Sequence, residues 1–112
     1  MKYVYPAIFH EANEGGYYVD FPDVEGAITQ GETLYEALEM AEDALAGILC
    51  LWEDAKAGRL DHPMTNRIQA PTPLDKVIPA KDEYSTGAFV VPVKADTDAY
   101  RLELEKRERK IA

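Results

Sequence analysis

Apolar residues recur at steps of three and four over one long stretch of the first half of the chain, the spacing of a single helix face. Thr33 stands just before this stretch and Glu36 follows three residues later, as in a capping box. Gly58 comes directly after Ala57 as a typical stop signal. The pattern predicts an α-helix that ends at Ala57 and buries a stripe of Leu34, Leu38, Ala41, Leu45, Ile48, Leu49 and Trp52.

Shorter runs, rich in residues that favour strands, flank this helix. Pro6 has no N–H to donate to a ladder, so it indicates an edge position or a local bulge, and Pro92 indicates an edge in the same way. The runs predict strands at Lys2–Phe9, Tyr17–Phe21, Ala27–Gln30 and Ala88–Val93.

Two further segments complete the pattern. Gly58–Glu83 is rich in proline and predicts an irregular connection, with a short helical turn at Leu74–Ile78. Asp96 is placed to cap a final helix. The elements together predict an α+β fold: a two-layer sandwich in which an antiparallel β-β-β-α-β sheet carries one long helix on one face.

Length and composition restrict the class of protein. The 112 residues predict one domain over residues 1–95, followed by a helical tail or linker at 96–112. No apolar run is long enough to cross a bilayer, and the start lacks the pattern of a signal peptide. The single cysteine, Cys50, has no partner within the chain, which favours a reducing cytoplasm. A thin core and the open edge expected of the strand at Ala88–Val93 predict a homo-oligomer, a dimer or larger.

The charge is unevenly distributed. Of the net −9, residues 1–61 contribute −10, from 13 acidic and three basic residues, and residues 62–112 contribute +1, from eight and nine. Phosphate groups would be repelled by the first half, so direct nucleic-acid binding there is disfavoured. A basic partner would be attracted, although the charge also suits ordinary solubility.

Several runs carry a resemblance to a known family. YPAIFH and GGYYVDFPDVEGAITQGETLYEALEMAEDAL resemble the N-terminal domain of the HicB antitoxin family, and FVVPVKADTDAYRLELE is similar to the family's last strand and the segment after it. The resemblance implies a partial RNase H-like fold and a cytoplasmic prokaryotic protein. It also implies a partner, a small basic HicA toxin that cleaves mRNA and is silenced by binding.

The chain departs from the family in one respect. Many members continue into a helix-turn-helix or ribbon-helix-helix domain, whereas this sequence stops at Ala112. Whether that domain is naturally absent or truncated stays open. Operator DNA is therefore expected as a partner only if a DNA-binding domain exists beyond Ala112.

The residue pattern does not favour catalysis. RNase H-type cleavage uses clustered carboxylates that hold metal ions, the first of them on the first strand, and Lys2–His10 carries none. His10 and His62 are isolated, so neither zinc nor another cofactor is expected, and His10 is read as a surface residue. Three interpretations remain: a toxin-binding antitoxin, a metal-dependent nuclease that uses the region of Asp20 and Asp23, and an orphan domain that only dimerises.

For the antitoxin interpretation, the candidate site is the acidic turn after the second strand. Its carboxylates would meet a basic toxin and nearby aromatic rings would supply apolar contact, although a strand phenylalanine is more commonly part of a core. The expected toxin-binding residues are Tyr18, Asp20, Phe21, Asp23 and Glu25.

Overall fold

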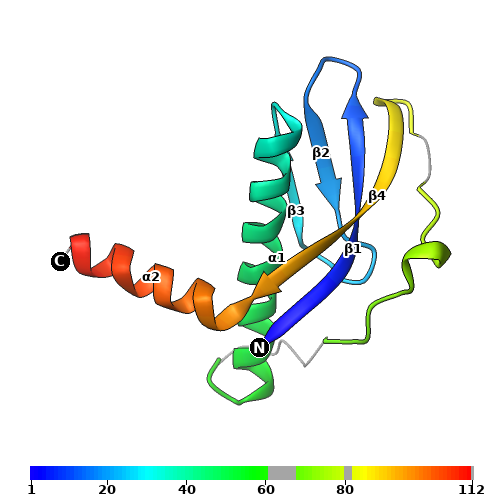
Figure 1. Ribbon diagram of the computed structural model, residues 1–112. Coiled ribbons are helices and arrows are strands. Elements are labelled where there is room, and N and C mark those ends of the chain that lie inside the picture. The colour runs from blue at the N-terminus through cyan, green and yellow to red at the C-terminus, as the bar shows by residue number, and fades with distance from the viewer. Residues whose placement is uncertain (61–67, 80–81, 112) are drawn as a thin grey trace.

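A computed structural model describes residues 1–60, 68–79 and 82–111 of the chain. Its centre is a single antiparallel sheet of four strands in the order β3-β2-β1-β4 (Figure 1). Two α-helices and a short 3-10 helix complete the fold, so the predicted α+β class and the β-β-β-α-β order are confirmed. The elements are β1 (Lys2–Ala12), β2 (Tyr17–Asp20), β3 (Ile28–Gly31), α1 (Leu34–Lys56), η1 (Leu74–Lys76), β4 (Ser85–Asp96) and α2 (Thr97–Ile111).

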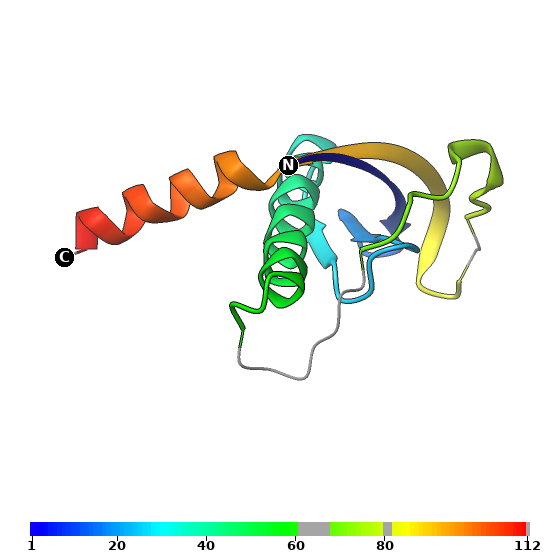
Figure 2. The ribbon, with the colours of Figure 1, turned by 90° about the horizontal axis from the view of Figure 1, so that it is seen from below.

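Helix α1 packs along one face of the sheet, as the views in Figures 1 and 2 both show. Thr33 has extended backbone angles and its hydroxyl accepts a hydrogen bond from the Glu36 N–H at 3.1 Å. The Glu36 carboxylate in turn accepts from the Glu32 N–H at 3.3 Å. The predicted cap is therefore present, and it fixes where the chain turns from β3 into the helix.

The core lies between α1 and the sheet. Tyr5, Phe9 and Val19 from the strands meet Leu45 and Leu49 from the helix, and each of these five side chains is almost completely buried. Burial of apolar side chains of this size is the main stabilising contribution in a small domain. The middle and end of the predicted stripe are thus confirmed.

The beginning of the stripe was predicted wrongly. Leu34 and Leu38 are 41% and 36% exposed, whereas Ala37 is fully buried. The cause is the close approach of α1 to β3: a Cβ added at Gly31 would lie 2.5 Å from the Ala37 nitrogen. Only small residues fit where the start of the helix packs against this short outer strand. The two leucines therefore lie on the parts of the helix that do not face the strand, and they remain exposed.

The two prolines mark different positions in the sheet. β4 is an outer strand, so the edge position predicted from Pro92 is confirmed. β1 lies between β2 and β4, so the edge position predicted from Pro6 is wrong for the strand as a whole. Pairing with β2 extends only over Ile8–Glu11, and Pro6 lies outside that stretch. A missing N–H is therefore tolerated there.

The chain ends in a helix that leaves the body of the fold. Asp96 accepts a hydrogen bond from the Ala99 N–H at 3.1 Å, which confirms it as the cap of α2. Tyr100 and Arg101 contact the body, and α2 then projects away from it (Figure 1). In the described part of the chain, no helix is both long and apolar enough to cross a membrane.

Candidate functional site

The five residues predicted to bind a partner have three different environments. Tyr18 and Asp20 lie on β2 and point to the sheet face opposite α1, which we call the open face. Phe21 is only 4% exposed and belongs to the core cluster. A side chain so deeply buried cannot anchor a partner without unfolding the turn, so Phe21 is structural.

Asp23 is hydrogen-bonded to another segment of the same chain. Its carboxylate accepts hydrogen bonds from the Thr72 N–H at 2.8 Å and from the Thr72 hydroxyl at 2.6 Å. Its backbone carbonyl accepts from the Gln69 side chain at 3.1 Å. These bonds hold the connection that follows α1 against the turn between β2 and β3. Glu25, in the same turn, is exposed.

Beside Asp20 lies a cluster built around a buried histidine. The His10 ring is stacked on Tyr18, with ring centroids 4.4 Å apart and planes 6° apart. Its Nε2 lies 3.5 Å from Asp20 Oδ1 and its Nδ1 lies 3.9 Å from Asp82 Oδ2. His10 is 6% exposed, so the surface position predicted for it is wrong. Its ring is covered because Tyr18 is its direct neighbour across the two strands.

Tyr18 also joins the open face to the segment before β4. Its hydroxyl donates a hydrogen bond to Asp82, and this bond lowers the pKa of that carboxyl below its usual value. Partial burial and the same bond raise the pKa of Tyr18. Both groups therefore keep their ordinary states at neutral pH, a carboxylate and a phenol, and the carboxylate adds to the negative charge here.

The next strand supplies two residues that the sequence-based site did not include. Ile28 is the β3 partner of Asp20, and Gln30 is the partner of Tyr18. Ile28 is 71% exposed, more than any other large apolar side chain in the described strands. Alternation along this run would have indicated it, because Ala27 and Thr29 point to the core side whereas Ile28 and Gln30 point to the other side. We call Tyr18, Asp20, Ile28 and Gln30 the β2–β3 face, and the exposed Glu25 lies in the turn that joins its two strands.

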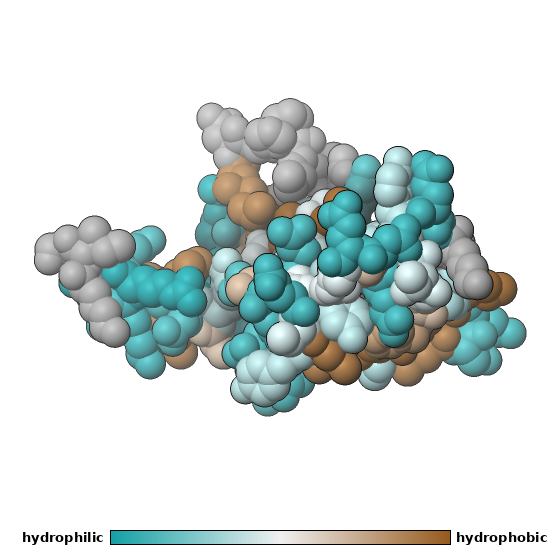
Figure 3. Space-filling model, turned by 90° about the horizontal axis from the view of Figure 1, so that it is seen from above, coloured by the Kyte–Doolittle hydropathy of each residue, from teal (hydrophilic) through white to brown (hydrophobic). Residues whose placement is uncertain are grey.

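A groove of about 680 Å³ extends from this face at the end of the molecule that holds the β1–β2 turn. Tyr18 and Gln30 belong to its wall, so groove and face are continuous. Figure 3 looks onto this end and shows mainly hydrophilic surface, with apolar atoms along one border. Three carboxylates and two further tyrosines line the groove: Glu14, Glu32, Glu36, Tyr17 and Tyr84.

The carboxylates of the predicted turn do not converge. Asp20 is directed toward His10, whereas Asp23 is bonded to Thr72. Among the residues that the structure describes, no three His, Cys, Asp or Glu side chains are arranged to hold a metal ion. His62 lies outside the described residues. Cys50 is buried, and burial raises the pKa of its thiol, so it is a weak nucleophile.

A solved structure of another protein has a similar fold. The chain aligns with a solved structure described as a toxin–antitoxin complex from Streptococcus pneumoniae, with a TM-score of 0.63 and 22% identity. The alignment covers 89% of this chain and 73% of the other. This likeness concerns the fold, an α+β domain of the kind found in that complex.

The family follows from the sequence match. Residues 5–111 match the model of the HicB-like antitoxin of bacterial toxin–antitoxin systems, and the chain belongs to that family. Over 41 residues it is 58% identical to Antitoxin HicB 1 of Photorhabdus laumondii subsp. laumondii and 56% identical to Antitoxin HicB of Escherichia coli K12. That stretch is 37% of this chain but spans only 26% and 30% of the two relatives. Membership of an antitoxin family indicates a non-enzymatic role.

Proposed function

We propose that the chain is the antitoxin of a type II toxin–antitoxin system, located in the cytoplasm, which binds a small basic HicA-type ribonuclease and covers its RNA-binding surface. Family membership supports the antitoxin role. The observation that carries the partner's chemistry is the exposed, acidic β2–β3 face, with the apolar Ile28 on its outer strand.

The physical argument begins with charge. A ribonuclease must present a positive surface to phosphates, and carboxylates on a competitor are attracted to the same surface. Asp20 supplies this charge on the face itself, Glu25 adds to it from the adjoining turn, and the carboxylates of the groove extend it. Exposed ion pairs contribute little affinity individually, so they mainly steer and orient the encounter.

Apolar contact must then supply much of the binding free energy. Ile28 is the exposed apolar side chain on the outer strand of the face, and Tyr18 lies two residue pairs away on the neighbouring strand, on the same side of the sheet. Tyrosine is one of the residue types enriched at binding hot spots, and an exposed apolar side chain on the same face adds area that a partner can bury. Ile28 therefore takes the anchoring role that the sequence suggested for Phe21.

Occlusion requires no catalytic group on this chain. The nuclease alternative would need carboxylates that converge on metal ions, and the separate bonding of Asp20 and Asp23 favours the binding role. The toxin is the proposed protein partner, and operator DNA is proposed as a partner only if a DNA-binding domain exists beyond Ala112.

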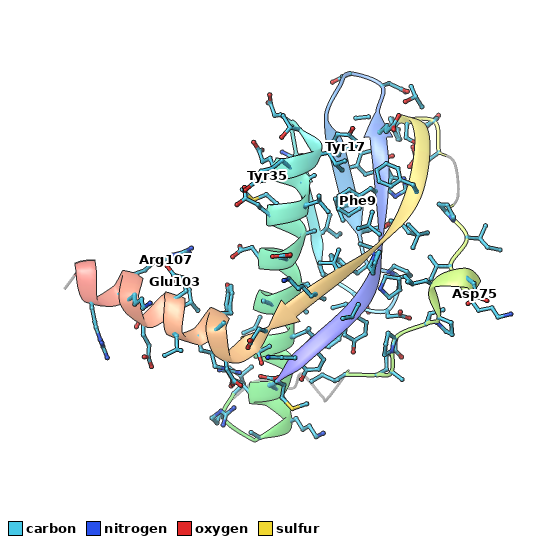
Figure 4. The ribbon with its side chains drawn as sticks, viewed as in Figure 1. Phe9, Tyr17, Tyr35, Asp75, Glu103 and Arg107 are labelled. Atoms are coloured by element: carbon cyan, nitrogen blue, oxygen red, sulfur yellow. The ribbon has the colours of Figure 1, made fainter. Side chains whose placement is uncertain are left out.

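Charge reversal on the face tests this proposal. The variant Asp20→Lys/Glu25→Lys should associate with the toxin at least about tenfold more slowly at low salt, because steering is lost. Asp23 and Phe21 stay unchanged because they hold the fold. A matched control, Asp75→Lys/Glu103→Lys, changes the net charge equally at sites away from the face (Figure 4). Stopped-flow association would measure both, after circular dichroism shows that both are folded.

Three outcomes are informative. Slow association of the face variant with normal association of the control supports docking on the β2–β3 face. Equal slowing of both variants would mean that only overall charge matters, and wild-type rates for the face variant would place the docking surface elsewhere.

A further inference from the structure

The groove at the β1–β2 turn is bordered by backbone that carries no side chain. Gly15 and Gly16 lie in this turn with positive φ angles of 98° and 77°, and both line the groove. A Cβ added at Gly16 would lie 3.0 Å from the Gly31 carbonyl oxygen, so a side chain there would narrow the space. The glycines therefore keep open a groove of about 680 Å³, a volume typical of pockets that take small ligands.

Tyrosine side chains border the groove from three places: Tyr17, Tyr18 and Tyr84. Tyr84 is 68% exposed, yet its N–H donates to Asp82 at 2.8 Å and its C=O accepts from the Asn13 N–H at 3.0 Å. The Tyr17 ring lies at the end of the sheet where α1 begins (Figure 4) and packs edge-on against Phe89, with centroids 6.3 Å apart. The Tyr84 backbone and the Tyr17 ring are thus in place before a partner arrives, which lowers the entropic cost of binding.

The groove is also strongly acidic. Glu14 and Glu32 are exposed at its border, and the carboxylate of the half-buried Glu36 accepts a hydrogen bond from the Glu32 N–H at 3.3 Å. No lysine or arginine is among the described residues that line it. Three like charges around one space repel each other, and a cation placed between them removes this repulsion. The groove therefore favours a positively charged group.

Carboxylates beside aromatic rings favour a guanidinium group over an ammonium group. A guanidinium is planar and weakly hydrated, so it can lie on a tyrosine ring while its N–H groups bond to carboxylates. An ammonium is a compact, strongly hydrated charge and gains less from the ring. A neutral side chain gains neither contact.

We propose that the groove receives an arginine side chain that the toxin presents from its RNA-binding surface. The guanidinium would lie on the Tyr84 ring and bond to Glu14 and Glu32. The groove shares Tyr18 and Gln30 with the β2–β3 face, so one bound protein would cover both. Arginines of such a surface bond to phosphates, and an arginine held in the groove is no longer available to RNA. This inference rests on the proposed function and adds the residue type that is recognised.

Nuclear magnetic resonance tests the groove without the toxin. N-acetyl-arginine methylamide at millimolar concentrations should shift the amide signals of Gly15, Gly16 and Gly31, which line the groove. The citrulline analogue has nearly the same shape but no charge and should leave these signals unchanged, and the lysine analogue should shift them less. The arginine probe should have no effect on them in the variant Glu32→Gln/Tyr84→Leu. Unchanged signals with the arginine probe, or equal shifts from arginine and either analogue, would overturn the proposal.

The affinity for a HicA-type toxin tests the partner. Tyr84→Leu should raise the Kd by about three- to thirtyfold, because a cation–π contact is lost, and Tyr84→Phe, which keeps a ring, should raise it less. Glu14→Gln/Glu32→Gln should raise the Kd by about two- to tenfold. The matched control Glu39→Gln/Glu42→Gln changes the net charge equally at exposed positions of α1 outside the groove, and should change the Kd by less than about twofold. Isothermal titration calorimetry measures all four variants.

A double-mutant cycle identifies the arginine. One arginine-to-lysine substitution in the toxin should weaken binding to the wild-type chain but cause little further loss in Tyr84→Leu, because both changes remove the same contact. Additive losses for every toxin arginine would overturn the proposal and leave the antitoxin role intact. Failure of the folded wild-type chain to bind the toxin would instead refute the proposed function, and the arginine probe would still show whether the groove binds a guanidinium group.

Discussion

Leu45 and Leu38 show how much a single position decides in this small fold. Leu45 is completely buried between α1 and the sheet, whereas Leu38 on the same helix is 36% exposed. Leu45→Ala should lower the free energy of unfolding by about 2–5 kcal/mol, because it removes buried methyl groups and leaves a cavity. Leu38→Ala, the same chemical change, should cost less than about 1 kcal/mol. Urea denaturation of both variants measures the difference, and equal losses would contradict this description of the core.

At the scale of residues, the sequence located the acidic turn but did not predict which of its side chains are bonded within the chain. Asp20, Asp23 and Glu25 look alike in one acidic turn, yet Asp23 is bound by Thr72, which is 49 positions away in the sequence. A contact of that separation leaves no local pattern. Phe21 followed the common behaviour of a strand phenylalanine and is buried. Ile28 was missed although the alternation of β3 indicated its exposure.

At the scale of elements, a polar cluster attaches α2 to α1. Arg101 of α2 forms ion pairs with Glu53 and Asp54 at 3.1 Å each, and donates a hydrogen bond to the Cys50 carbonyl. The Glu53 carboxylate also accepts from the Tyr3 hydroxyl at 2.6 Å and from Thr97 at 2.9 Å. This cluster joins the first strand, the two helices and the end of β4.

The cluster predicts a specific dependence of stability on pH. Burial alone would raise the pKa of Glu53, but the hydrogen bonds from Tyr3, Thr97 and Arg101 outweigh it and lower the pKa. A carboxyl whose pKa is lower in the folded state stabilises the fold above its unfolded pKa, and this contribution is lost as pH falls through the folded value. Glu53→Gln should therefore be less stable than wild type at neutral pH.

The measurement is the melting temperature followed from neutral pH to about pH 3. The difference in melting temperature between wild type and Glu53→Gln should shrink as the pH falls, because protonation makes the wild-type Glu53 side chain neutral, as glutamine is at every pH. Glu105→Gln, on the exposed part of α2, is the control and should follow wild type throughout. A difference that stays constant with pH would show that the charge of Glu53 does not stabilise the junction.

Elements were predicted well where the pattern was local. The cap at Thr33, the end of α1 and the cap at Asp96 all depend on residues within a few positions of one another, and each is confirmed. The long β4 was predicted only in its central part, because its ends carry polar residues that pair with β1 at a distance. Strand order likewise depends on non-local pairing, which is why Pro6 was misread.

At the scale of the whole molecule, the family, the charge and the shape are all consistent with a protein that binds a basic partner. An acidic domain of the HicB-like family presents an open sheet face on one side and a helix-covered face on the other. The β2–β3 face lies at one outer strand, β3, and β4 is the other outer strand of the sheet.

The most direct test of the antitoxin role is an RNA cleavage assay with a HicA-type toxin from the same genome. Titration of the folded chain into the toxin should reduce cleavage in proportion to the amount added and abolish it near molar equivalence, because occlusion is stoichiometric rather than catalytic. The chain alone, with Mg²⁺ or Mn²⁺, should leave the RNA intact. Undiminished cleavage in the presence of excess folded chain, or cleavage by the chain itself, would contradict the role proposed for it.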